Sequence, residues 1–242
     1  SVFDFDGDGR DEVVYADECF SRVYDGVTGD VLFSQYHTSC TWYENPIVAD
    51  VAGNFKAAVV IPSNRNCNVT CPALDPIHDG VRCDTNADCP AATTCGRENA
   101  GDKYGRCRCT QTADCGDPGL ACADPIAGPS PVGKVCRAAH PQGVAQQGIF
   151  VLHDALDRWV ASRPLWNQHA YAVTNVNDDG TIPKTSAWTA NWKNAKLNNF
   201  RLNKQGALNP LDSPDLTSAP DAPPGQSTQL SCSGTTLTLQ AR

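Results

Sequence analysis

The sequence predicts an all-β protein made of repeated small sheets, with a disulfide-rich and loop-dominated insertion. Short β-branched and aromatic runs such as EVVYAD at residues 12–17 are typical of strands. An acidic loop recurs at Asp4, at Asp50 after 46 residues, and at Asn175 after a long interruption that holds ten of the 13 cysteines. A period of this length with several short strands per unit predicts β-propeller blades, which must stack because one blade cannot bury its own faces.

The composition excludes several classes of protein. The chain has 242 residues, a net charge of −8 and no basic patch, which argues against nucleic acid as a partner. No apolar run approaches the roughly 18 residues of a transmembrane helix, so we expect no direct membrane insertion. The cysteine count indicates a disulfide framework and therefore a secreted, extracellular protein. Because methionine is absent and the sequence begins at Ser1, we expect a processed chain or a piece of a longer one.

The first acidic loop, DFDGDGRDE at residues 4–12, has the pattern of a calcium site. Alternate aspartates can turn their carboxylates to one side of a tight loop, and Gly9 permits the turn because glycine tolerates positive φ. Ca²⁺ takes six to eight oxygen ligands in flexible geometry. The expected ligands are four side chains and one main-chain carbonyl: Asp4, Asp6, Asp8, Glu12 and the backbone carbonyl of Arg10. The alternative is a solvated acidic turn that holds no ion.

A four-cysteine pattern occurs twice in the insertion, at residues 83–107 and 109–136. Both copies have the form C-x5-C-x5/6-C-x11/13-C, so we expect two small modules that are each held by two disulfides. First-to-third and second-to-fourth pairing is favoured, although four cysteines allow three connectivities. Structural zinc is the rival interpretation, but the short CxxC knuckles and Cys/His pairs that zinc prefers are missing.

The remaining cysteines lie outside this repeat. Cys19 and Cys40 are candidates for a bridge between neighbouring strands of the first blade, and Cys67 and Cys71 are candidates for a second pair. Cys232 is left over, and we expect its partner beyond residue 242. Twelve cysteines are therefore expected in disulfides: Cys19, Cys40, Cys67, Cys71, Cys83, Cys89, Cys95, Cys107, Cys109, Cys115, Cys122 and Cys136.

Composition shifts divide the chain into five segments. A Pro-rich stretch resembles a linker, and the alternating residues after it resemble the first strands of another domain. The expected segments are blades with the calcium loop at 1–63, the cysteine-rich insertion at 64–144, the final blade and closing segment at 145–208, the linker at 209–226, and the start of a further β domain at 227–242.

The stretches DFDGDGRDEVVY, ENPIVADV and WNQHAYAVTNVNDDGTIP resemble FG-GAP (VCBS-type) repeats. These repeats form the blades of integrin-α-like propellers in bacterial surface and secreted proteins, and the resemblance covers about residues 1–63 and 145–203. The family's calcium motif, D-x-[DN]-x-D-G-x-x-[DE], is complete at residues 4–12. The resemblance therefore implies a calcium-binding propeller on a bacterial cell surface.

The other two loops match the family's calcium motif to different degrees. In the Asp50 loop, Ala52, Phe55 and Ala58 replace the second ligand, the glycine and the final acid, so we predict no ion there. The third loop is partial, because Pro183 stands where the last acid belongs. Its candidate ligands for a weaker metal site are Asn175, Asn177 and Asp179, and the alternative is an Asx-turn alone. The insertion resembles Dickkopf-type cysteine-rich modules, and the tail from Pro214 resembles the start of an Ig-like, CARDB-type adhesion domain.

Catalytic motifs are absent from the sequence: there is no GxSxG elbow, HExxH or Walker loop. We therefore expect no enzymatic activity. Trp166, Asn167 and His169 are candidates for a ligand-binding shelf for sugar, and inter-blade packing is the alternative. The expected function is cell-surface adhesion or a structural surface role, with a protein or glycan partner or with self-assembly. The alternatives are a carbohydrate-binding module of a larger secreted enzyme and a subunit of an extracellular filament.

Overall fold

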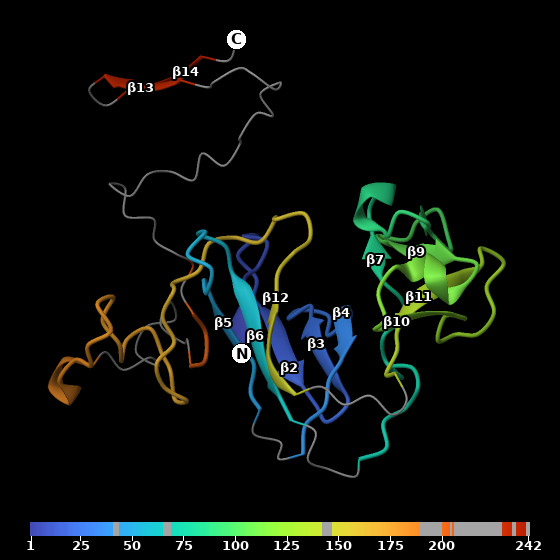
Figure 1. Cartoon of the computed structure of the whole chain (residues 1–242), viewed down its shortest axis with the longest axis horizontal. Coiled ribbons are helices and arrows are strands. Elements are labelled where there is room, and N and C mark those ends of the chain that lie inside the picture. The colour runs from blue at the N-terminus through green and yellow to red at the C-terminus, as the bar shows by residue number, and fades with distance from the viewer. Residues whose placement is uncertain are drawn as a thin grey trace. The chain divides into compact units, whose positions relative to one another are not determined.

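Antiparallel strands make up most of the regular structure (Figure 1). The computed structural model describes residues 1–40, 44–64, 69–141, 147–188, 200–203 and 205, and the backbone of the strands at 229–233 and 236–240. The chain divides into two units, Ser1–Gly206 and Ala207–Arg242. The second unit contains one antiparallel hairpin, β13 (Gln229–Ser233) with β14 (Thr236–Gln240).

The first sheet is a four-stranded meander in the order β1–β2–β3–β4. Alternation in EVVYA puts every second side chain of β2 into the core, which is the period expected of a half-buried strand. The four strands are β1 (Val2–Phe3), β2 (Glu12–Ala16), β3 (Phe20–Tyr24) and β4 (Val31–Tyr36).

The second sheet repeats the first part of this arrangement. Its strands are β5 (Ile47–Ala49), β6 (Ala58–Ser63) and β12 (Gly148–Leu152). β5 pairs with β6 in the same register as β1 with β2, because Ala49 opposes Ala58 as Phe3 opposes Glu12, each position 46 residues later. The cysteine-rich insertion lies between β6 and β12, which are themselves paired, so it occupies a hairpin connection of this sheet.

The core lies between these two sheets, and Figure 1 shows the second sheet in front of the blue strands of the first. Val160 ties the two acidic loops together, because its N–H donates to Phe5 and its carbonyl accepts from Ala57, both at 2.9 Å. The buried core side chains are Phe3, Phe5, Val14, Val23, Val48, Ala57, Val59 and Ile61.

The cysteine-rich module contains a five-stranded antiparallel sheet and two short 3-10 turns. Its apolar core is small and includes Cys109, Cys115 and Cys136, so disulfides take the place of larger side chains. The elements are β7 (Arg82–Cys83), η1 (Asn86–Asp88), β8 (Thr94–Gly96), β9 (Gly105–Cys109), η2 (Thr112–Cys115), β10 (Leu120–Ala123) and β11 (Lys134–Ala138). A further 3-10 turn, η3 (Thr185–Ala187), follows the third loop.

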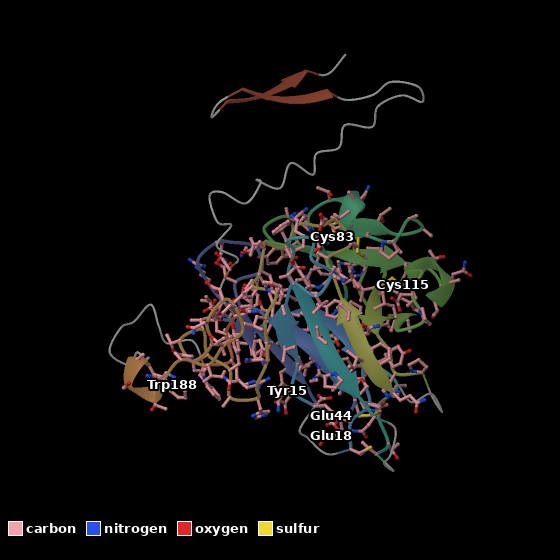
Figure 2. All side chains as sticks on the ribbon, turned by 60° about the vertical axis from the view of Figure 1, so that its left-hand side comes forward. Tyr15, Glu18, Glu44, Cys83, Cys115 and Trp188 are labelled. Carbon is pink, nitrogen blue, oxygen red and sulfur yellow. A yellow bond between two sulfur atoms is a disulfide. The ribbon has the colours of Figure 1, made fainter. Side chains whose placement is uncertain are left out.

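The disulfides of the two copies follow the first-to-third and second-to-fourth order favoured from the sequence. Figure 2 labels Cys83 in the first copy and Cys115 in the second. The bridges are Cys83–Cys95, Cys89–Cys107, Cys109–Cys122 and Cys115–Cys136.

The pairing expected for the other cysteines is wrong. Cys19 bonds to Cys71 across 52 residues, so neither a Cys19–Cys40 nor a Cys67–Cys71 bridge forms. The reason is register: the N–H of His37 donates to the carbonyl of Cys19 at 2.7 Å, so His37 and not Cys40 lies opposite Cys19. Cys40 is disulfide-bonded as well, and Cys67 lies outside the described residues.

A buried ion pair fixes the insertion to the first sheet. Arg22 on β3 is 4% exposed and Asp75 is fully buried. The guanidinium donates to both oxygens of Asp75, at 2.6 and 3.0 Å, and also contacts Asp17. Burial acts to raise the pKa of Asp75, but the hydrogen bonds from Arg22 and Ser34 outweigh it, so the pKa lies below its usual value. Asp75 is therefore a buried anion whose charge is matched by Arg22.

The broad expectation of an all-β, disulfide-rich protein is what the structure shows. The described strands form separate open sheets, and none of these sheets closes into a ring. In the described part of the chain there is no helix long and apolar enough to span a membrane.

Removing the buried anion should destabilise the protein. We expect Asp75→Ala to lower the free energy of unfolding by about 3 to 5 kcal/mol, because Arg22 would keep a buried charge without its main partner. Asp84→Ala is the matched control, since Asp84 pairs with Arg97 and both side chains are exposed, 68% and 39%; its loss should cost at most about 1 kcal/mol. Urea unfolding measures both, and equal losses would contradict this account.

Candidate metal centre

The loop between β1 and β2 is folded around one carboxylate. Asp4 Oδ1 accepts hydrogen bonds from the backbone N–H groups of Gly7 and Asp8, at 2.7 and 3.1 Å, and Oδ2 accepts from Gly9 at 2.9 Å. Gly7 and Gly9 have φ angles of 76° and 86°, in the left-handed region that favours glycine. The tight turn predicted at Gly9 is therefore made by two glycines.

Three of the predicted ligand side chains converge in this loop. Carboxylate oxygens of Asp4, Asp6 and Asp8 all lie within 4.8 Å of one another. Asp6 and Asp8 are exposed to solvent, and Asp4 is half-buried. The N–H of Arg10 donates to Asp8 Oδ1 at 2.8 Å; a role for the carbonyl of Arg10 stays a prediction. A hard cation fits this all-oxygen donor set.

Glu12 lies at the start of β2 and has a different environment. Its side chain is 9% exposed and does not belong to the set of three converging carboxylates. Glu12 Oε2 accepts a hydrogen bond from the N–H of the buried Phe5 at 2.9 Å. Burial, together with the negative charges of the three aspartates, raises the pKa of Glu12 to about 7 against the lowering effect of the Phe5 bond. Glu12 therefore has a local structural role as well as its predicted metal role.

The loop between β5 and β6 is a second version of the same fold. Asp50 Oδ1 accepts from Gly53 and Asn54 at 2.7 and 3.2 Å, and Oδ2 accepts from Phe55 at 2.9 Å. These donors lie three, four and five residues after the aspartate, as in the first loop. Asn54 Oδ1 accepts from the N–H of Lys56 at 3.2 Å, as Asp8 does from Arg10. Even Phe55, in the place of Gly9, has a positive φ of 62°.

Comparing the two loops shows which side chains the loop conformation requires. The second loop has Ala52 where the first has Asp6, and Asn54 where the first has Asp8. Because the backbone arrangement is the same, neither extra carboxylate is needed to form it. Like charges held close together repel one another. In the first loop, the repulsion between the three carboxylates is therefore unfavourable, and the loop conformation does not require the two extra ones.

The third candidate loop is arranged differently. Asn175 turns away from it, since its Oδ1 accepts from the N–H of Ala172 and its Nδ2 donates to the carbonyl of Ala170. Asp179 Oδ1 accepts from the N–H and the hydroxyl of Thr181, and Asn177 Nδ2 also donates to that hydroxyl. This is local turn bonding of Asn177 and Asp179, without the Asp4-type cradle. A weaker metal site at this loop stays a prediction.

The candidate ligand-binding shelf contains a packed tryptophan. The ring of Trp166 stacks on Tyr171, with centroids 4.3 Å apart, and the guanidinium of Arg201 lies 5.2 Å from the ring centroid. Asn167 and His169 are exposed. Trp166 thus takes part in intramolecular packing, and sugar binding at this place stays a prediction.

Cysteine sulfurs also cluster, in two groups of three. All six take part in the disulfides given above, so their sulfurs are not thiolates that could bind zinc. The important residues missed from the sequence are Arg22 and Asp75. An arginine in the middle of the apolar strand FSRVY is the one signal that could have pointed to a buried ion pair.

Alanine variants of the loops show which carboxylates stabilise the fold in the absence of calcium. In EDTA, we expect Asp4→Ala and Asp50→Ala each to lower the free energy of unfolding by about 1 to 3 kcal/mol, because three backbone N–H groups lose their acceptor. In the same buffer, Asp6→Ala should change it by less than about 0.5 kcal/mol. Urea unfolding of the three variants is the measurement, and a large loss for Asp6→Ala without calcium would contradict the comparison of the loops.

Comparison with known proteins gives one structural likeness. No protein-family model matches the chain, and no curated protein matches it. Among solved structures, the chain is similar to the crystal structure of the V. cholerae biofilm matrix protein Bap1, with 23% sequence identity and a TM-score of 0.40. The likeness covers 76% of this chain and 19% of that one, so this chain spans less than two thirds of that protein's length.

Proposed function

We propose that residues 4–12 bind one Ca²⁺ and that the chain is a calcium-stabilised structural or adhesion module of an extracellular surface. One observation carries the calcium proposal: the Asp50 loop adopts the same conformation without the extra carboxylates. Asp6 and Asp8 therefore add negative charge that the fold does not require. A divalent cation is the simplest partner that makes this charge favourable.

Calcium suits the donor set better than other common metals do. The converging ligands are carboxylate oxygens, which hard cations prefer, and the described loop offers neither sulfur nor imidazole. Two of the three aspartates are exposed, so water can complete a flexible shell of six to eight oxygens. Mg²⁺ demands stricter octahedral geometry and should bind more weakly.

The disulfides support an extracellular location. Disulfides persist in oxidising compartments, and small modules without a large apolar core depend on them. In this chain they hold both copies of the cysteine repeat and also join the insertion to the first sheet through Cys19 and Cys71. Extracellular calcium modules bind with dissociation constants of about 10⁻⁴ to 10⁻³ M, which matches a site with few buried ligands.

The two sheets are proposed to be blades of the FG-GAP type. Support comes from the strand–loop–strand unit, which recurs after 46 residues with the same strand register and the same aspartate cradle. The proposed role is binding or structural, without catalysis. In keeping with this, the buried histidines His37 and His78 are hydrogen-bonded to the main chain. The proposed partner is a protein or glycan at a cell surface, or another copy of the chain.

Calcium titration of the metal-free protein tests the central proposal. We expect calorimetry to show one Ca²⁺ per chain and Asp6→Ala to weaken binding at least tenfold, because it removes a carboxylate from the shell. Calcium at about 100 times the dissociation constant should add about 2.7 kcal/mol to the free energy of unfolding.

Asn54→Ala is the control, since it alters the corresponding position of the second loop and should leave calcium binding unchanged. MgCl₂ in place of CaCl₂ tests the choice of ion. A wild-type protein with no binding heat, and with the same melting temperature in calcium and in EDTA, would refute the proposal.

A further inference from the structure

The first and second sheets pack through faces that are not equivalent. On β2, Val14 points into the core between the sheets, whereas Val13 points away from it and is 37% exposed. On β6, the residue that enters this core is Val59. Val59 lies 46 positions after Val13, so it corresponds to the outward-facing Val13 and not to Val14. We call the face with Val14 the front of the first sheet, and its opposite face the back.

With these names, the front of the first sheet packs on the back of the second. The front side chains of the first sheet in this contact include Phe3, Val14 and Val23. The back side chains of the second sheet are Val48, Val59, Ile61 and Leu152. The two sheets are thus stacked in the same sense, front to back. Among the described strands, such a stack leaves one front and one back without a partner sheet.

The free front belongs to the second sheet and is the apolar part of its front around Val60. The rest of this front is already covered within the chain, because Ala49 is 3% exposed and Ala58 is fully buried. Val60 and Pro62 lie 46 positions after the core-facing Val14 and Ala16 of the first sheet. Across the sheet, Ile47 and Val151 flank Val60, and Ile149 lies opposite Pro62. Ile149 is 72% exposed and Val151 is 42% exposed. Clustered exposed apolar side chains of this kind mark an interaction surface.

The free back belongs to the first sheet. Tyr15, which Figure 2 labels, is 55% exposed and corresponds to the core residue Ile61. Val13 and its cross-strand neighbour Tyr24 extend this surface. The insertion covers only the other half of the back, where Arg22 contacts Asp75. The free back is therefore the face of β1 and β2, with Tyr15 and Val13 at its centre.

We propose that the free front of the second sheet docks on the free back of the first sheet in a second copy of this chain. Val60 on the free front corresponds to Val14, which packs in the core within the chain. Val13 and Tyr15 on the free back correspond to Val59 and Ile61, which pack there too. The surface that fits against the front around Val60 is thus the face around Val13 of a second copy. The inference names a partner for the structural role proposed above and rests on that role, but the contact itself needs no calcium.

The geometry of this contact predicts how copies add. Front and back are different surfaces, so the contact is heterologous, and a dimer still has one free front and one free back. Assembly therefore continues past the dimer, either to a closed ring or to an open filament. Because the insertion covers part of the back, each contact is small, and we expect assembly only at high protein concentration.

Sedimentation equilibrium of the whole chain over a concentration series tests the inference. We expect a weight-average mass that rises above twice the 25.9 kDa of one chain, in calcium and in EDTA. Val151→Glu on the front and Tyr15→Glu on the back should each reduce assembly at least tenfold. Val27→Glu is the control, because Val27 is 65% exposed in the β3–β4 turn, on neither face, and should not change assembly. Circular dichroism checks that each variant is folded.

A mixture of the two variants gives the sharpest readout. Val151→Glu keeps an intact back and Tyr15→Glu keeps an intact front, so an equal mixture should form dimers and nothing larger. A wild-type chain that stays monomeric overturns the inference, and so does assembly that both variants leave intact. If that monomer still binds calcium, the docking contact alone has failed; if assembly occurs without calcium binding, the metal proposal alone has failed.

Discussion

A carboxylate that accepts three successive backbone N–H groups is the interaction on which the rest of the structure depends. Asp4 and Asp50 each make this cradle directly after an edge strand, β1 or β5. The cradle sets the length of the loop, which sets the register of the next strand. Because both units share that register, their side chains alternate in the same way, and the two sheets can pack front to back around one core.

Much of this arrangement could be predicted from the sequence because its signals are local. The strand pattern, the 46-residue period, the tight turn at Gly9 and the paired cysteine spacings all lie within short stretches. The cradle at Asp50 was harder to foresee, since Phe55 replaces a glycine whose φ is positive. Its three hydrogen bonds hold the backbone in that conformation in spite of the substitution. The same loop conformation thus forms with and without the second and third aspartates.

Features that depend on distant contacts could not be predicted. Arg22 and Asp75 are separated by 53 residues, and Cys19 and Cys71 by 52, so no spacing rule joins them. Both links depend on the position of the insertion, where Asp75 contacts Arg22 on β3 and Ser34 on β4. The insertion therefore does more than extend a hairpin: a buried ion pair and a disulfide attach it to the back of the first sheet. The cation–π partner of Trp166, Arg201, is likewise distant in the sequence, whereas its stacking partner Tyr171 is a near neighbour.

We propose that the two loops, which share one shape, differ in the ability to hold a cation. A crystal structure of the protein with calcium, recorded with anomalous scattering, compares both loops in one experiment. We expect a peak about 2.3 to 2.6 Å from oxygens of Asp4, Asp6 and Asp8, and none at the Asp50 loop. Calcium at both loops, or at neither when calcium is in large excess, would contradict it.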